Sequence, residues 1–215
     1  MRSYISPIGY DSARVTRPVI SHGLDTDDRI ILLRPERETD DARASQAVRD
    51  VKRMTTQIEP EVEIDLKEIP HDDFQEAVLR ISDVFEDNPG ELIVNLSGGA
   101  RDIFATLCIA SIVHVDRINT VLSFSDIDGD VRSVDLPNLT VDVPPSAIET
   151  LRQIDENNDK ISISELSDQL DIAKSTVTRH LQHLESRGLV ETWLEGKPKY
   201  ARITFSGRLL AQTRD

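Results

Sequence analysis

A glycine pair followed by an arginine is the pattern with the clearest chemical potential in the first half of the chain. The segment 97–101, Ser-Gly-Gly-Ala-Arg, separates the apolar run 92–96 from an apolar stretch of helical length. A glycine turn between a strand and a helix presents backbone N–H groups and the helix dipole to an anion. Arg101 could add a charge-assisted hydrogen bond to a phosphate. Glycines there also permit tight packing, and the spacing fits neither the Walker motif nor GxGxxG, so both interpretations stay open.

A second set of polar residues lies on a predicted helix at 173–184. Its apolar positions recur at helical spacing and are expected to face a core: Ala173, Val177, Leu181 and Leu184. The residues left pointing outward are of the types that contact phosphates and base edges of DNA, with Arg179 as the best candidate for a base contact. The DNA-contacting set on this helix is Lys174, Ser175, Thr176, Thr178, Arg179 and Gln182.

The elements around this helix predict a winged helix-turn-helix. A short amphipathic helix with serine caps is expected within 161–170, followed by a tight turn at 171–172. Two strands, 189–194 and 199–204, flank a compact turn at 195–198, and Lys197 and Lys199 give this wing a basic tip for DNA. A winged helix can also serve protein contacts alone, since a fold does not fix a function.

The first half alternates short apolar runs with longer amphipathic stretches, which predicts an α/β domain with a mostly parallel, Rossmann-like sheet. Strands are expected at 4–8, 29–33, 62–66, 92–96 and 120–124, with helices at 13–22, 40–58, near 74–85 and at 100–113. The runs around Ile31 and Ile93 are apolar throughout, as in central strands, whereas the alternating run at Val62 indicates a peripheral one. Asp128-Gly129 suits a hairpin turn into 131–136. The nearby Asp126–Asp130 pattern departs from a calcium loop, whose twelfth residue would here be Pro137.

Proline residues mark the predicted domain boundary. Strand-helix alternation ends in the segment 137–145, which contains Pro137, Pro144 and Pro145. The predicted organisation is therefore a Rossmann-like domain over 1–136, a linker over 137–145 and a winged helix-turn-helix over 146–215.

The charge distribution differs between the two halves. The 215 residues carry 39 Asp and Glu against 25 Lys and Arg, a formal net charge of −14, and the preference for 19 Arg over 6 Lys resembles proteins of salt-loving archaea. Residues 143–215 hold 10 basic and 11 acidic residues, so nearly all of the excess lies before them. Within 172–214 there are 8 basic residues against 3 acidic ones, the footprint of a phosphate-binding surface.

Several classes of protein are disfavoured by composition. The single cysteine, Cys108, excludes an intramolecular disulfide framework and a Cys-rich metal site. No metal is expected, because no Cys or acidic pair completes a metal site with His180 and His183. The start of the chain lacks the pattern of a signal peptide, and the longest apolar stretch, 103–115, is too short to cross a bilayer. The expectation is a cytoplasmic protein without a membrane partner.

Three segments together carry a family resemblance: "YISPIGYD" at 4–11, "VNLSGGARD" at 94–102 and "STVTRHLQHLESRGLVE" at 175–191. They resemble the CRISPR-associated Rossmann-fold (CARF) winged-helix transcription regulators of archaea, of a haloarchaeal type here. The resemblance implies a homodimer whose sensor domains share a two-fold pocket for a cyclic oligoadenylate, suspected to be cyclic tetra-adenylate, coupled to binding of double-stranded DNA, with no other cofactor. The ligand-binding residues carried over are Pro7, Ile8, Gly9, Tyr10, Ser97, Gly98, Gly99 and Arg101, with Asp11 and Asp102 facing away from phosphates.

Other functions remain alternatives to this one. A regulator sensing another ligand, or none, keeps the same two-domain plan. Some sensor domains of this family cleave their cyclic ligand, but an enzyme is not expected because neither pocket loop holds a His or Lys as a general acid or base. A nicotinamide oxidoreductase lacks its glycine fingerprint after the first strand. The nearly all-apolar helix after Arg101 supports a dimer, since in a small domain it needs cover on two sides.

Overall fold

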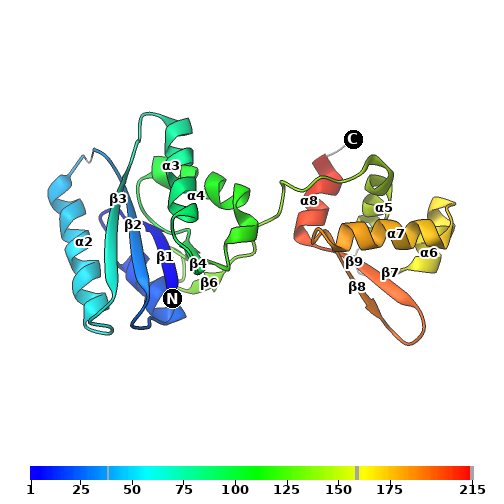
Figure 1. Ribbon diagram of the computed structural model, residues 1–215, viewed down its shortest axis with the longest axis horizontal. Helices are drawn as coiled ribbons and strands as arrows, with labels where there is room; N and C mark the ends of the chain where they lie inside the picture. Colours follow the sequence, from blue (N-terminus) through cyan, green and yellow to red (C-terminus); the bar gives the residue numbers. More distant parts are fainter. Residues whose placement is uncertain (38, 158–159, 214–215) are drawn as a thin grey trace. The chain divides into compact units, whose positions relative to one another are not determined.

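The computed structural model describes residues 1–37, 39–157 and 160–213, and the chain divides into two compact units, Met1–Leu136 and Pro137–Asp215 (Figure 1). The first unit contains β1 (Arg2–Pro7), α1 (Ala13–His22), β2 (Arg29–Pro35), α2 (Asp41–Thr56), β3 (Glu63–Ile69), α3 (Phe74–Glu86), β4 (Glu91–Asn95), α4 (Arg101–Val113), the 3-10 turn η1 (Val115–Arg117), β5 (Thr120–Phe124) and β6 (Val131–Ser133).

The six strands of the first unit form one sheet in the order β3-β2-β1-β4-β5-β6. The pairs from β3 to β5 are parallel, and β6 alone runs antiparallel, against β5. The predicted mostly parallel Rossmann-like sheet is confirmed, with the apolar runs of β2 and β4 inside it and the alternating strand β3 at its edge. The chain builds one half of the sheet as β1, β2 and β3 and then crosses from β3 to β4, which lies on the other side of β1. The topological switch point is therefore between β1 and β4.

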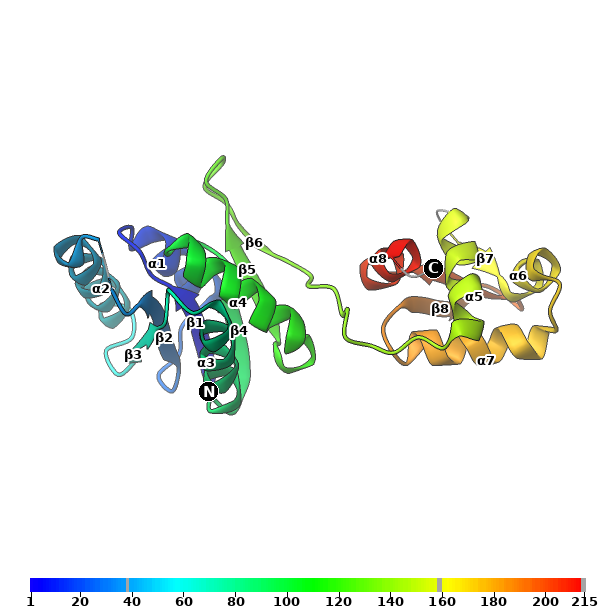
Figure 2. The same cartoon turned by 90° about the horizontal axis from the view of Figure 1, so that it is seen from above.

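Helices cover both faces of this sheet because successive strand residues point to opposite sides. On one face, the core residues Tyr4, Ile30 and Ile93 pack with residues of α1 and α2. On the other, Ile5, Ile31 and Val94 pack with residues of α3 and α4. Figure 2 shows these helix layers around the sheet and the β5–β6 hairpin extending beyond them. Strand β6 ends at Ser133, three residues earlier than its pattern predicts.

The second unit contains α5 (Pro145–Glu156), β7 (Ile161–Ser162), α6 (Ile163–Leu170), α7 (Lys174–Glu185), β8 (Val190–Leu194), β9 (Lys199–Ile203) and α8 (Phe205–Thr213). Its three strands pair antiparallel in the order β7-β9-β8. The predicted winged helix is confirmed. The terminal helix α8 was not predicted. The Thr204 hydroxyl caps its start by accepting a hydrogen bond from the Gly207 N–H at 3.1 Å.

Local contacts fix the geometry of the helix-turn-helix. Ser162 and Glu165 form a reciprocal capping box at the start of α6. Asp171 takes the left-handed conformation, with φ of 51°, and so ends α6 sharply. His180 of α7 is buried and lies 2.8 Å from the Thr150 hydroxyl of α5. Burial, then the neighbouring charge of Arg179, lowers the pKa of His180, so this residue is a packing element.

The predicted linker is partly absorbed into the second unit. Val143 is buried in the same core as Ala147 and Leu151, and Val141 packs against that core. The Asn138 N–H donates to the Ser206 hydroxyl at 2.9 Å. The prolines interrupt the strand-helix alternation of the sequence, but Val141 and Val143 are apolar and pack against the core of the second unit.

Among the described residues no helix combines the length and the apolarity that crossing a membrane requires.

Candidate functional site

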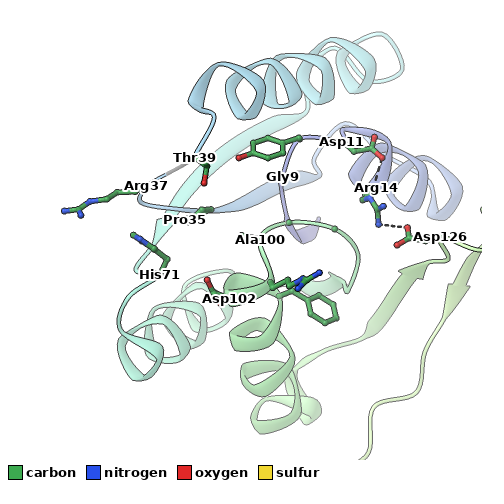
Figure 3. A pocket seen from close by; sticks show the side chains of 15 residues that line it. Gly9, Asp11, Arg14, Pro35, Arg37, Thr39, His71, Ala100, Asp102 and Asp126 are labelled. Carbon is green, nitrogen blue, oxygen red and sulfur yellow. Dashed lines mark ion pairs between the residues drawn. The ribbon is translucent and has the colours of Figure 1, made fainter.

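The first candidate site is a cavity of about 690 Å³ in the first unit, at the carboxyl ends of the parallel strands (Figure 3). Its volume lies in the range of small-molecule pockets, roughly 300–1,000 Å³. Loops after β1, β2, β3 and β4 all contribute to it, as expected for a ligand site at a topological switch point. It is lined by Gly9, Tyr10, Asp11, Arg14, Pro35, Arg37, Thr39, His71, Gly98, Gly99, Ala100, Arg101, Asp102, Phe104 and Asp126.

Glycines allow the loops after β1 and β4 to touch at the floor of this cavity. A Cβ on Gly9 would lie 3.3 Å from the Gly99 Cα, and a Cβ on Gly99 would lie only 2.5 Å from the Pro7 Cβ. Gly98 and Gly99 both have φ of 75°, a conformation that side chains with a Cβ rarely adopt. The packing interpretation of the glycine pair is therefore correct, and the same loop leads into the N-terminus of α4, where N–H groups lack intrahelical partners. Packing and anion binding are compatible here.

Five of the eight predicted ligand-binding residues line the cavity: Gly9, Tyr10, Gly98, Gly99 and Arg101. Three do not. Pro7 and Ile8 are buried beneath it, and Ile8 belongs to the hydrophobic core. The Ser97 hydroxyl faces β5, where it accepts a hydrogen bond from the Phe124 N–H at 2.6 Å. These three residues support the loops from inside the domain and do not line the cavity.

A proline in α1 creates a polar contact under the cavity. Pro18 lies inside the helix and has no N–H to donate to the Arg14 carbonyl four residues earlier. The Asn95 side-chain amide, from the end of β4, donates to that carbonyl at 2.8 Å and also to the Ser6 hydroxyl of β1 at 2.8 Å. Asn95 is almost completely buried. It therefore links α1 to the two central strands and fixes where the Arg14 side chain begins.

The Arg14 side chain lies between two carboxylates at the rim of the cavity (Figure 3). Its guanidinium forms an ion pair with Asp126 of the β5–β6 hairpin and lies 3.5 Å from Asp11. The hydrogen bond to Asp126 is the main cause of a raised Arg14 pKa. A Cβ on Gly98 would come within 2.8 Å of the Arg14 Cδ, so the glycine loop also sets the path of this side chain.

The cavity is richer in charge than the sequence indicated. Arg14, Arg37 and His71 join Arg101 among its lining residues. The expectation that Asp11 and Asp102 face away from it is wrong, since both line it. Asp11 is engaged locally, accepting a hydrogen bond from the Ala13 N–H at 3.0 Å.

The loops after β2 and β3 were missed by sequence reasoning. They bring Arg37, Thr39 and His71 to the cavity. The rule that parallel strands share one carboxyl edge would have included them, because both strands were predicted. The argument that neither pocket loop holds a histidine thus fails for the cavity as a whole. The Nδ1 of His71 is buried without a hydrogen-bond partner among the described residues.

Tyr10 offers an aromatic surface at the cavity. Its side chain is 41% exposed, and its hydroxyl accepts a hydrogen bond from the Asp40 N–H at 3.2 Å. The Arg43 guanidinium lies 4.8 Å from the ring centroid. These contacts hold the ring in place, and a planar base can stack on a fixed aromatic ring.

The second candidate site is the outer face of α7. Val177, Leu181 and Leu184 are buried as predicted, but Ala173 is exposed because it caps the helix instead of lying within it. Thr176 and Thr178 are half-buried, and the Thr178 hydroxyl donates to the Lys174 carbonyl at 2.8 Å. The exposed members of the predicted set are Lys174, Ser175, Arg179 and Gln182.

The wing has one basic residue at its tip. Lys197 is exposed in the turn between β8 and β9. Lys199 is half-buried and lies 3.8 Å from Glu185 at the end of α7, so the strand register directs it away from the tip. Trp193 and Tyr200 stack across the two strands with ring centroids 6.2 Å apart, which stiffens the wing.

Comparison with known families accounts for both units. Residues 2–130 match the model of the Csa3 CRISPR-associated Rossmann-like domain. The chain belongs to this family. Residues 141–194 match the MarR family, which supplies the winged helix. A CARF domain and a MarR-type winged helix in one chain are the parts of a DNA-binding regulator with a ligand-sensing domain. No protein of curated function matches the sequence.

The chain is similar to several solved structures at low sequence identity. Csm6 of Enterococcus italicus, bound to cyclic hexa-2'-fluoro-hexa-dAMP, is 15% identical, with 87% of this chain and 49% of that chain covered and a TM-score of 0.50. Can2 of Sulfobacillus thermosulfidooxidans, in complex with cyclic tetra-adenylate, is 15% identical over 99% and 63%, with a TM-score of 0.43. AF1382 of Archaeoglobus fulgidus is 27% identical over 31% and 77%, with a TM-score of 0.30. This CARF regulator thus spans about half the length of Csm6.

Replacing Asn95 tests how the CARF cavity is held together. Asn95→Ala leaves the Arg14 carbonyl and the Ser6 hydroxyl without their donor, and we expect it to destabilise the first unit by about 1–3 kcal/mol. In a Pro18→Ala background, position 18 regains an N–H that can donate to the Arg14 carbonyl. Asn95→Ala should then lower the free energy of unfolding by less than it does in the wild type. Urea unfolding of the full chain, followed by hydrogen exchange in peptides from residues 1–136, measures both effects.

Asn88→Ala is the matched control for this cycle. Asn88 is also buried and donates to a backbone carbonyl, that of Val84 at 2.7 Å, with no connection to Pro18. Asn88→Ala should lower the free energy of unfolding by the same amount in the wild type as in the Pro18→Ala background. If Asn95→Ala also lowered it by the same amount in both backgrounds, the proposed compensation would be contradicted.

Proposed function

We propose that this protein is a homodimeric transcription regulator of CRISPR-associated genes, in an archaeal antiviral defence, that binds DNA under control of a cyclic oligoadenylate. The observation that carries the proposal is the presence, in one chain, of an arginine-containing cavity at the switch point of a CARF domain and an exposed basic helix in a MarR-type winged helix. The acidic composition, 39 Asp and Glu against 25 Lys and Arg, supports a salt-loving host. A regulator that senses a different ligand uses the same parts and is distinguished below.

The DNA-binding part of the proposal rests on the face of α7. Lys174 and Arg179 are exposed, and neither is paired with an acidic side chain in the described part of the chain. Residues early on the second helix of a helix-turn-helix reach base edges when that helix lies in the major groove. Lys197 on the wing is placed to contact a phosphate. Arg179 is the proposed base-reading residue, and Lys174 and Lys197 the proposed phosphate contacts.

The ligand part of the proposal rests on the cavity's charge, shape and size. Arg101 at the start of α4 and Arg14 at the rim suit phosphates, and the Tyr10 ring suits a base. The Csm6 structure with the same fold holds a cyclic oligonucleotide analogue, which supports this class of ligand. We infer that one ring is shared by two protomers, each contributing one cavity of about 690 Å³ at its switch point.

The dimer part of the proposal rests on α4. Phe104, Ile109 and Val113 lie on its outer side and are 38%, 41% and 54% exposed. Cys108 lies half-buried between them, and burial raises the pKa of its thiol, which makes it a packing residue instead of a nucleophile. A contiguous apolar stripe on a monomer surface favours a protein interface, and α4 begins at the cavity. Pairing through α4 would bring two cavities together.

Ile109→Glu tests the dimer. A buried, unpaired carboxylate in the interface should convert the dimer to a monomer, as measured by light scattering after size-exclusion chromatography. Met54→Glu is the control, because Met54 is 38% exposed on α2, which packs on the opposite face of the sheet. Dimers of equal mass in both variants would place the interface elsewhere.

A pair of arginine variants tests the division between sensing and reading. Arg179→Ala should weaken binding to promoter DNA by about 5- to 150-fold, the value of a base contact, and leave binding of cyclic tetra-adenylate unchanged. Arg101→Ala should weaken the ligand and leave DNA binding without ligand unchanged. Titration calorimetry in the salt that the protein tolerates, with a stoichiometry of one ring per dimer, and DNA gel shifts measure these effects.

Arg208→Gln controls for loss of a positive charge in the same unit, since Arg208 lies on α8 and pairs with Asp155. Absence of heat with cyclic tetra-adenylate in the wild type would leave a regulator of the same architecture with another signal.

Ligand cleavage is the second candidate function, favoured by His71 in the cavity lining. We expect binding without turnover, because a histidine base needs an orienting partner and the Nδ1 of His71 has none among the described residues. Chromatography of cyclic tetra-adenylate after long incubation with the protein should recover the intact ring. Linear products that disappear in a His71→Ala variant with unchanged ligand affinity would instead identify a ring nuclease.

A further inference from the structure

The ion pair between Arg14 and Asp126 joins the cavity to the segment that leads out of the sensor domain. Asp126 lies in the tip of the β5–β6 hairpin, residues 125–130, and also lines the cavity. After the hairpin, β6 ends at Ser133, and Pro137, separated from it by three residues, begins the DNA-binding unit. The hairpin is thus the last structured element of the sensor before the connection.

From this arrangement we propose that Arg14 is an additional phosphate-binding residue and that Asp126 competes with the ligand for it, so that ligand binding releases the hairpin tip from α1. The inference rests on the proposed function, because it requires an anionic ligand in the CARF cavity. It adds the residue that senses the ligand and the element that moves in response.

Exposure makes the pair exchangeable. The Arg14 side chain is 33% exposed and that of Asp126 is 60% exposed, and ion pairs accessible to water contribute little net stability. A phosphate held at the same time by the N-terminus of α4 and Arg101 would offer Arg14 charge-assisted, bidentate hydrogen bonds. Such a ligand outcompetes a single carboxylate on a hairpin.

The backbone of Arg14 stays fixed while its side chain changes partner. Asn95 holds the Arg14 carbonyl at 2.8 Å, and Gly98 packs against the aliphatic part of the side chain. The guanidinium can therefore turn toward the cavity without movement of α1. The mobile partner is Asp126, which belongs to a turn.

A released Asp126 has no second cation available within the hairpin. Arg132 is already engaged by Asp128 and lies 3.6 Å from Asp130. Asp128 is held firmly, since the Asp130 N–H, followed by Ser125 and Arg132, lowers its pKa to about 2. Next to a bound phosphate, Asp126 would be repelled. Arg17 of α1 also stays near the hairpin: its guanidinium lies 5.3 Å from the Phe124 ring centroid at the base, and its Nη1 would lie 3.5 Å from a Cβ on Gly129.

Calorimetry with cyclic tetra-adenylate on full-length single and double variants tests the competition. Asp126→Asn should raise affinity about three- to tenfold, and Arg14→Gln should lower it about tenfold or more. In the Arg14→Gln background, Asp126→Asn should no longer raise affinity, because the competed-for cation is gone. Asp102→Asn measures the through-space effect of removing one negative charge from the same cavity. The increase in ligand affinity caused by Asp102→Asn should be smaller than that caused by Asp126→Asn, and it should persist in the Arg14→Gln background.

Hydrogen exchange of peptides covering 125–133 gives a readout independent of affinity. Ligand should speed exchange there in the wild type, and Asp126→Asn should show the fast exchange already without ligand. Asp130→Asn, in the same hairpin but outside the cavity lining, should behave as wild type.

The outcomes separate the two proposals. If the wild type binds the ring but Asp126→Asn gains no more than Asp102→Asn, or gains equally without Arg14, the competition is wrong and the sensor function stands. If the wild type binds no cyclic tetra-adenylate, the proposed ligand fails and this inference fails with it.

Discussion

The sensor unit is organised around the close approach of two loops at the centre of its sheet. The loops after β1 and β4 touch closely, because Gly99, with a positive φ and no Cβ, lies against Pro7, and Gly9 lies against Gly99. The cavity exists because the chain reverses its direction of winding between these two strands, and four strand ends open onto the same edge. Asn95 stabilises this arrangement by supplying the hydrogen bond that Pro18 denies to α1. Because Pro18 leaves the Arg14 carbonyl without a helix partner, Asn95 can bind this carbonyl and hold α1 against the central strands beneath the cavity.

Charge is divided between the units according to their tasks. The acidic excess lies before residue 143, where some of the carboxylates pair with arginines on the surface of the sensor, as between Arg29 and Glu63 or Arg34 and Glu68. The winged helix is nearly neutral and places its basic residues on the face of α7 and on the wing. A protein with a net charge of −14 can thus present a locally basic surface to DNA, and at high salt base contacts and shape must contribute more than counterion release.

The proposed signal path uses a solvent-exposed ion pair at the rim of the cavity. The hydrophobic layers on both faces of the sheet are fully buried and do not change partners easily, whereas an exposed ion pair on a hairpin does. The chain then continues from that hairpin directly into the winged-helix unit, where Val141 and Val143 anchor it to the core. Coupling of two sites requires an element with two arrangements, and the hairpin tip meets this requirement better than the sheet.

Periodicity, glycine spacing and the three family-like segments were sufficient to predict the order of strands and helices in the first unit, the parallel sheet with its edge strand, the winged helix and five of the residues that line the cavity. These features are local or follow from burial on one or two faces, so neighbours along the chain encode them. Only the tertiary structure decided that Ile8 and Ser97 face inward, that Lys199 turns toward Glu185, and that His71, Arg37 and Asp126 join the cavity. Each of these depends on which residues from distant segments meet at one sheet edge or across one strand pair. The pairing of Asn95 with a helix carbonyl that Pro18 leaves open is the clearest case, since its two causes lie 77 positions apart in the chain.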